Sequence, residues 1–227
     1  MTNQENHLQQ MLVTLRTRLL VMCAATGLAL EDACKALRDG DMGRAGAVID
    51  GDAVIDALEN EIDDKALSLL ARAQPVARDL RFVVSALRMV SDLERIGDEA
   101  SSIAERAIIM QDLLPLPIME EVSRLMDMAC MLYNSSVTAF RDGDRELALS
   151  VCRGDDDASQ MEIRIIQRLM QDMGGNMDPH VGMHIILITR ALNRIWRRAS
   201  NIAEHAYFVM EGVSIKHKKV EAPAASA

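Results

Sequence analysis

Apolar residues recur along this chain with the spacing of a helix face, in six segments separated by short runs that contain Gly or Pro. The rhythm is clearest between residues 75 and 114 and again after residue 176, where apolar positions alternate at steps of three and four. A seam with this spacing predicts long helices that pack nearly parallel to their neighbours. The seam positions are Ala86, Met89, Leu93, Ile96, Ala100, Ile103, Ala107 and Met110, and then Ile185, Ile188, Leu192, Ile195, Ala199, Ile202, Ala206 and Val209.

The two halves of the chain resemble each other. The sequence Arg-Asp-Gly-Asp at Arg38–Asp41 recurs at Arg141–Asp144, and Leu93–Glu105 is identical to Leu192–Glu204 at eight positions. The sequence therefore predicts an all-α fold of two tandem three-helix bundles, with six long helices and short antiparallel connections. The predicted repeats span residues 1–112 and 118–212, and residues 213–227 are predicted to be a flexible tail.

Composition supports a helical core and excludes some functions. The chain has 227 residues, of which 49% are hydrophobic and only 3% aromatic, so it can bury a core but does not suit an aromatic-rich β-sandwich. The net charge of −9 argues against nucleic-acid binding and favours cations or basic protein surfaces as partners.

The cellular location is predicted from the cysteines and from one apolar stretch. Cys23, Cys34, Cys130 and Cys152 have no metal-binding or disulfide-framework spacing, so they are predicted to be reduced in a cytoplasmic protein. The apolar stretch at residues 19–30 is too short to span a bilayer, and its rhythm continues on both sides. It is predicted to be part of a core helix, without direct membrane insertion.

The first half holds an unusual density of carboxylates. Asp52 and Asp56 lie four residues apart on the second predicted helix, and Glu94 and Asp98 lie four apart on the third. Antiparallel pairing about Pro75 would place Asp98 level with residue 52 and Glu94 level with residue 56. The neighbouring carboxylates are Glu59, Asp63, Asp92 and Glu105.

Four carboxylates at one level repel one another, and a hard cation would relieve that repulsion because such ions prefer oxygen ligands. The alternative is an ordinary acidic solvent face of a long helix. The second half lacks the pattern, since Asn193 and Arg197 stand at the positions of Glu94 and Asp98, and Ser159 stands at that of Asp56. We therefore expect one metal-capable site, in the first half, with Arg197 supplying positive charge in the second.

Other chemical candidates are weaker. His180 and His184 are four residues apart and could contribute to a zinc site, but no third ligand is evident. Trp196 could pack locally or anchor an interface, and Arg194, Arg197 and Arg198 form a basic patch. There is no phosphate-binding glycine loop, nucleophile motif or Glu-x-x-His sequence. The functions that remain open are a binding protein, a carboxylate-bridged metalloenzyme and a metal-storage bundle.

Three stretches together resemble the PhoU family of bacterial phosphate-uptake regulators. They are residues 48–63, residues 74–81 and the sequence Ser-Asp-Leu-Glu-Arg-Ile-Gly-Asp at residues 91–98. The resemblance implies a six-helix, two-repeat bundle without enzymatic activity. It also implies metal binding (Mg, Mn, Fe or Zn) through the pairs Asp52/Asp56 and Glu94/Asp98.

The same resemblance implies a cytoplasmic negative regulator of phosphate-starvation signalling. Such a protein acts between the ATPase subunit of the phosphate transporter and the phosphate sensor histidine kinase, and tends to form homodimers. PhoU proteins usually repeat Glu-Arg-Ile-Gly-Asp in the second half, where this chain has Asn193-Arg-Ile-Trp-Arg197. The departure supports a metal site in the first repeat only.

Overall fold

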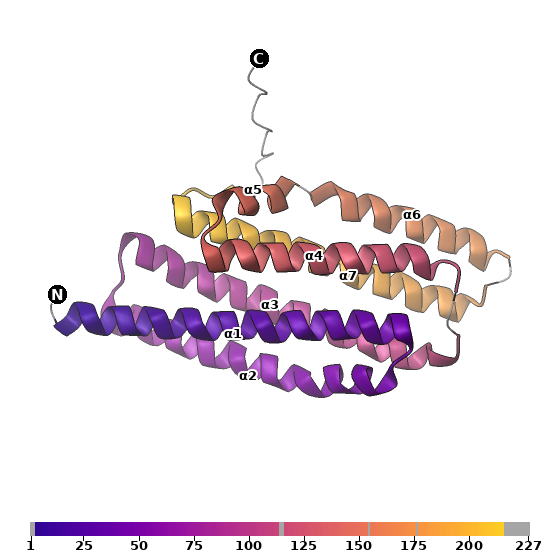
Figure 1. Ribbon diagram of the computed structural model, residues 1–227, viewed down its shortest axis with the longest axis horizontal. Helices are drawn as coiled ribbons and strands as arrows, with labels where there is room; N and C mark the ends of the chain where they lie inside the picture. Colours follow the sequence, from indigo (N-terminus) through magenta and orange to yellow (C-terminus); the bar gives the residue numbers. More distant parts are fainter. Residues whose placement is uncertain (1–2, 114–115, 154, 176, 216–227) are drawn as a thin grey trace, which may run out of the picture.

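The computed structural model describes residues 3–113, 116–153, 155–175 and 177–215, and these form an elongated bundle of α-helices (Figure 1). No strand occurs within these ranges, which confirms the all-α prediction. The elements are α1 (Asn3–Asp39), α2 (Met42–Ala73), α3 (Ala77–Ile109), the 3₁₀ turn η1 (Gln111–Leu113), α4 (Met119–Asp142), α5 (Arg145–Arg153), α6 (Asp155–Met173) and α7 (Pro179–Glu211).

Each of the six predicted segments is helical, and in the fifth α5 and α6 lie on either side of residue 154, which is outside the described residues. The predicted tail at residues 213–227 lies mostly outside the described residues.

The repeated Arg-Asp-Gly-Asp sequence ends one helix and begins the next in both halves. Gly40 and Gly143 take the left-handed conformation, with φ of +67° and +70°. Asp41 then accepts a hydrogen bond from the backbone N–H of Arg44, and Asp144 accepts one from Leu147, each at 3.0 Å. The same four residues therefore build the same turn twice, as expected for a duplicated chain.

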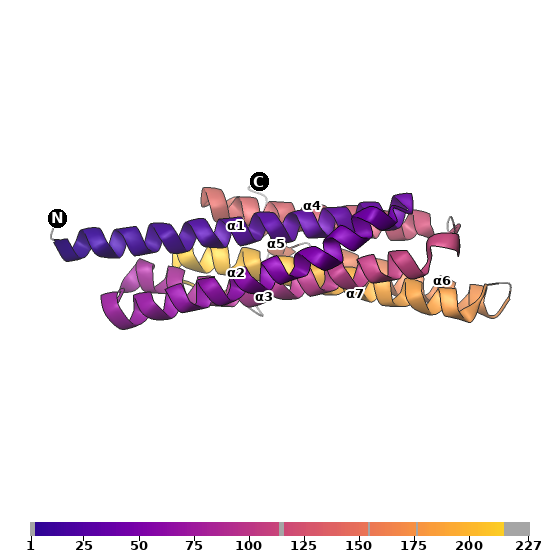
Figure 2. The ribbon, with the colours of Figure 1, turned by 90° about the horizontal axis from the view of Figure 1, so that it is seen from below.

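The two repeats lie side by side along their length. Helices α1, α2 and α3 pack against one another, and α7 packs against α4, α5 and α6. The repeats meet where α3 lies along α7 and α1 lies along α4, which both views show (Figures 1 and 2). All of the predicted seam positions on α3 and α7 are buried, and they belong to one hydrophobic core shared by both repeats.

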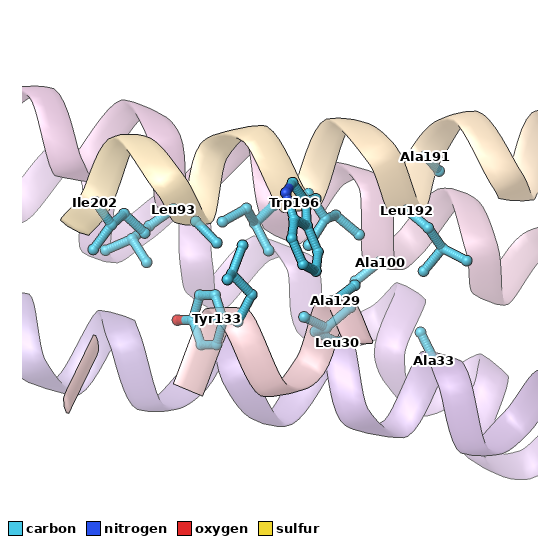
Figure 3. Packing of buried hydrophobic residues seen from close by; sticks show 14 of the residues in the cluster. Leu30, Ala33, Leu93, Ala100, Ala129, Tyr133, Ala191, Leu192, Trp196 and Ile202 are labelled. Carbon is cyan, nitrogen blue, oxygen red and sulfur yellow. The ribbon is translucent and has the colours of Figure 1, made fainter. Parts of the chain in front are cut away.

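Aromatic residues of the second repeat fill the shared core. Tyr133 of α4 donates a hydrogen bond to the carbonyl oxygen of Cys23 on α1 at 2.6 Å. Its ring lies where a Cβ atom at Gly27 would be only 2.9 Å away, so the lack of a side chain there lets α1 and α4 approach closely. Trp196 of α7 points into the same core (Figure 3) and is 4% exposed, so it packs locally.

Helix α1 is long and apolar enough over Asn6–Asp39 to cross a membrane by length and composition alone, with 33% of the apolar window buried. Its inner face carries Leu15, Leu19 and Leu30, which are fully buried, as predicted for a core helix. Val13 and Leu28 on its outer face remain exposed.

Candidate functional site

The carboxylates of the first repeat lie beside a close contact between α2 and α3. Gly97 of α3 is buried against α2, and a Cβ atom there would be 2.9 Å from Cδ1 of Ile55 and 3.5 Å from Oδ1 of Asp52. Asp98 follows Gly97 directly, so the predicted pairing of Asp98 with the region of residue 52 is found. A glycine at this position allows acidic residues of two helices to share one small volume.

Asp98 interacts electrostatically with three other carboxylates of the cluster, Asp52, Glu59 and Glu94. Burial raises the pKa of Asp52, and Asp56, Asp98 and Glu105 raise it further, against a lowering by the Ser101 hydroxyl. Burial also raises the pKa of Glu59, and Asp63, Asp56 and Asp98 add to that effect. The repulsion predicted from the sequence is therefore a property of the folded chain.

Glu94 is the most perturbed carboxylate of the cluster. Burial, followed by the charges of Asp98 and Glu59, raises its pKa to about 7. Its side chain is 21% exposed and lies 3.8 Å from Nε of Arg95, whose charge acts in the opposite direction. A neighbouring cation stabilises the ionised form of a carboxylate, and this effect matters most for a carboxylate that is hard to ionise near neutral pH.

The orientation of α2 about its own axis brings Glu59, and not Asp56, next to Glu94. Glu94 interacts with Glu59, while Asp56 is exposed at the edge of the cluster. Buried Ile55 and Ile62 define the inward side of α2. At about 100° per residue, Glu59 lies roughly 50° from this direction and Asp56 roughly 110°. In the sequence, Glu59 is one of the neighbouring carboxylates. Its small angle from the buried side of α2 is the signal that places it in the cluster.

The donor set suits a hard cation, because every polar group offered by Asp52, Glu59, Glu94 and Asp98 is a carboxylate oxygen. In the part of the chain that the structure describes, no three His, Cys, Asp or Glu side chains converge tightly enough to ligate one ion. The carboxylates flank the core at the molecular surface, so small rotamer changes would be needed to direct their oxygens at one point.

In the second repeat, the glutamate at the position of Glu59 contacts a hydrogen-bond donor and an arginine. Asn193, at the position of Glu94, donates a hydrogen bond to Glu162, at the position of Glu59. Arg190 lies 3.9 Å from the same Glu162 carboxylate. Glu162 of the second repeat therefore has an amide donor and a nearby guanidinium, where Glu59 of the first repeat has further carboxylates around it.

Arg197, which is expected to supply positive charge in the second repeat, is exposed on α7. The side chain of Asp155, which stands at the position of Asp52, lies outside the described residues, so the role of Arg197 stays a prediction. Arg194 forms a bidentate pair with Glu99 of α3 across the repeats.

Asp92 is close in sequence to the carboxylates of the cluster, but it faces α7. It is 7% exposed and accepts hydrogen bonds from Arg198 at 3.0 Å and from Asn201 at 3.2 Å. His205 Nε2 lies 3.7 Å from its other oxygen. Asp92 therefore holds the two repeats together and does not belong to the acidic cluster.

The two histidines do not form a metal site with other described residues. His180 is exposed at the start of α7, where its backbone N–H donates to the capping side chain of Asp178. His184 is half-buried one turn later, and no third ligand lies near them within the described residues.

Comparison with known proteins identifies the duplicated bundle. Residues 19–107 and 122–206 each match the PhoU domain. The chain belongs to the PhoU family. A PhoU homolog from Pseudomonas aeruginosa, named as a phosphate-specific transport system accessory protein, is 35% identical over 206 residues, or 89% of this chain and 84% of that protein. A Thermotoga maritima PhoU homolog with the same designation is 27% identical over 92% of this chain and 91% of its own length.

Solved PhoU structures share the fold. The crystal structure of PhoU from Pseudomonas aeruginosa superposes with a TM-score of 0.87 at 34% identity, covering 90% of this chain and 99% of that one. PhoU from Streptococcus pneumoniae, titled a phosphate transport system regulatory protein, gives a TM-score of 0.83 at 23% identity, which shows the fold alone. The two-repeat architecture is therefore the PhoU architecture.

Proposed function

We propose that this protein regulates phosphate uptake as a non-enzymatic accessory protein of a phosphate transport system. The observation that carries the proposal is the PhoU domain match in both repeats, together with relatives of nearly the same length that bear that designation.

The finer proposal concerns partners and direction. The protein acts in the cytoplasm as a negative regulator of phosphate-starvation signalling, linking the transporter ATPase subunit to the sensor histidine kinase. It does so as a homodimer without inserting into the membrane. The family resemblance of residues 91–98 supports this part, and the acidic charge of −9 suits basic surfaces on a partner.

The acidic cluster of Asp52, Glu59, Glu94 and Asp98, with Asp56 at its edge, is the proposed metal site. A bound divalent or iron cation would supply positive charge that offsets the repulsion among these carboxylates. The residues of α2 would then be held against those of α3, with Gly97 permitting the close approach. The cation would thus fix the relative position of two helices and does not enter a reaction.

The proposed regulatory role is tested by deleting the gene and measuring a phosphate-starvation reporter in phosphate-rich medium. Constitutive reporter expression, reversed by the intact gene, is the expected result. Complementation with Glu94→Ala/Asp98→Ala tests whether the metal site is needed for regulation. A reporter that stays off in the deletion strain would contradict the role in phosphate signalling.

A further inference from the structure

Two cysteines meet at the interface between the repeats. Cys34 of α1 and Cys130 of α4 have their Sγ atoms 3.9 Å apart, within range of a weak S–H···S hydrogen bond. Cys34 is 4% exposed, whereas Cys130 is half-buried, so Cys130 is the more accessible residue of the pair. Both thiols are reduced in the structure.

Flanking polar contacts keep the two sulfur atoms together. One turn from the pair in one direction, Arg38 of α1 forms an ion pair with Asp127 of α4. One turn in the other direction, Asn134 of α4 donates a hydrogen bond to Glu31 of α1 at 3.5 Å. These contacts fix the register of α1 against α4 on both sides of the cysteines.

From this juxtaposition we infer that Cys34 and Cys130 form an oxidation-sensitive pair, which peroxide converts into a disulfide linking the two repeats. The disulfide would tie α1 to α4 and prevent the repeats from moving apart along this interface. The inference is independent of the phosphate-related function, because it rests on the geometry of two thiols.

The chemistry begins at the more accessible sulfur. The hydrogen bond between the thiols lowers the pKa of Cys130 and raises that of Cys34, and burial raises the pKa of Cys34 further. Arg38 lowers both values, whereas Asp127 raises both and Glu31 raises that of Cys130. A thiolate is the form that reacts with peroxide, so Cys130 is the expected first site.

The reaction balances with hydrogen peroxide as the oxidant. The Cys130 thiolate attacks one peroxide oxygen, the O–O bond breaks, hydroxide leaves, and a sulfenic acid forms on Cys130. The sulfur of Cys34 then attacks the Cys130 sulfur, an S–S bond forms, and the hydroxyl group leaves as water. The two thiol protons end in the two water molecules, both sulfurs are oxidised, and the peroxide oxygens are reduced.

The other two cysteines cannot replace either member of the pair. Cys23 precedes Cys34 by eleven residues on the same helix, roughly 16 Å along its axis. Burial raises the pKa of Cys23 to about 12, which keeps it protonated. Cys152 lies in α5 beside the backbone carbonyl of Ser200 on α7. It therefore offers a matched control.

The test treats the full chain with hydrogen peroxide, blocks the remaining thiols and maps linked peptides by mass spectrometry. We expect a Cys34–Cys130 peptide within one chain, a fall from four free thiols to two when they are counted in the denatured chain, and reversal by dithiothreitol. Cys152→Ser should form the same linkage. Cys34→Ser should instead stop at a sulfenic acid on Cys130, which a dione reagent traps. Four thiols that survive peroxide, or linkages that join different chains or involve Cys23, would overturn the inference.

Discussion

At the scale of single residues, Asp92 shows how one buried charge can join two repeats. Its carboxylate accepts hydrogen bonds from Arg198 and Asn201 of α7 and lies close to His205 of the same helix. Its side chain is only 10% exposed. Removing one member of such a group leaves the others desolvated without a counter-charge. The interaction belongs to the packing between repeats, so it is expected to matter for stability and not for metal binding.

Replacing Asp92 by Asn should therefore lower the free energy of unfolding by about 2–3 kcal/mol, because Arg198 loses its partner in a largely buried place. Chemical denaturation at neutral pH measures this loss. The exposed Asp64→Asn is the control and should change stability by less than about 0.5 kcal/mol. A variant as stable as the parent would refute the role of Asp92.

Glu94 gives a prediction about pH. Its pKa rises from about 4.5 in the unfolded chain to about 7 in the folded one, so the folded state holds the proton more tightly. Ionisation of Glu94 therefore costs the metal-free protein stability as pH rises from about 4.5 to 7, and this cost is complete above 7. Glu94→Gln removes this cost.

With a chelator present, Glu94→Gln should match the parent in thermal midpoint near pH 4.5 and exceed it near pH 8. The difference between the two proteins isolates Glu94 from the other carboxylates, whose pKa values are also raised. A constant difference across this pH range would show that Glu94 keeps an ordinary pKa.

The sequence predicts part of the cluster and not its whole. A hairpin fixes which residues of two helices share a level, so Asp52 and Asp98 could be paired from spacing alone. The rotation of each helix depends on its core positions, which is why Glu59 takes the place expected for Asp56. Asp92 could not be assigned, because its partners lie about a hundred residues away on α7.

At the scale of elements, the turns and seams were the most predictable features. The repeated Arg-Asp-Gly-Asp sequence carries its own cap and left-handed glycine, and the 3–4 seam marks the buried side of α3 and α7. Both depend on residues within a few positions of each other. The close contact of α2 with α3 at Gly97 depends on distant residues and became visible only in the structure.

The contact at Gly97 is tested by comparing two glycine substitutions. Gly51 lies in α2 with nothing within 4 Å of a Cβ atom, so Gly51→Ala should raise stability by about 0.5–1 kcal/mol through helix propensity. Gly97→Ala should give no such gain, because its Cβ atom would meet Ile55 at 2.9 Å. Equal stabilisation by both substitutions in denaturant titrations would show that α2 and α3 do not approach closely there.

At the scale of the whole molecule, the two repeats share one core. Internal similarity predicts two bundles but does not say how firmly they join. The structure answers this with α3 packed along α7, α1 along α4, and the side chains of Tyr133 and Trp196 between them. These contacts connect residues far apart in the chain, so local patterns could not reveal them.

A continuous core should unfold as one unit. Calorimetry on the full chain should therefore show a single transition, with the calorimetric enthalpy equal to the van't Hoff enthalpy. Two resolved transitions, each assignable to one repeat, would contradict the shared core.

The central claim, that the acidic cluster of the first repeat binds a metal and the second repeat does not, is tested most directly by metal stoichiometry. The purified full chain is dialysed against Mn²⁺ and Fe²⁺ in separate experiments and analysed for bound metal. Glu94→Ala/Asp98→Ala should lose the bound metal while circular dichroism stays helical. The control Glu120→Ala/Glu146→Ala removes two exposed carboxylates of the second repeat and should keep it. Unchanged stoichiometry in the Glu94/Asp98 variant, or two equivalent sites per chain, would contradict the account.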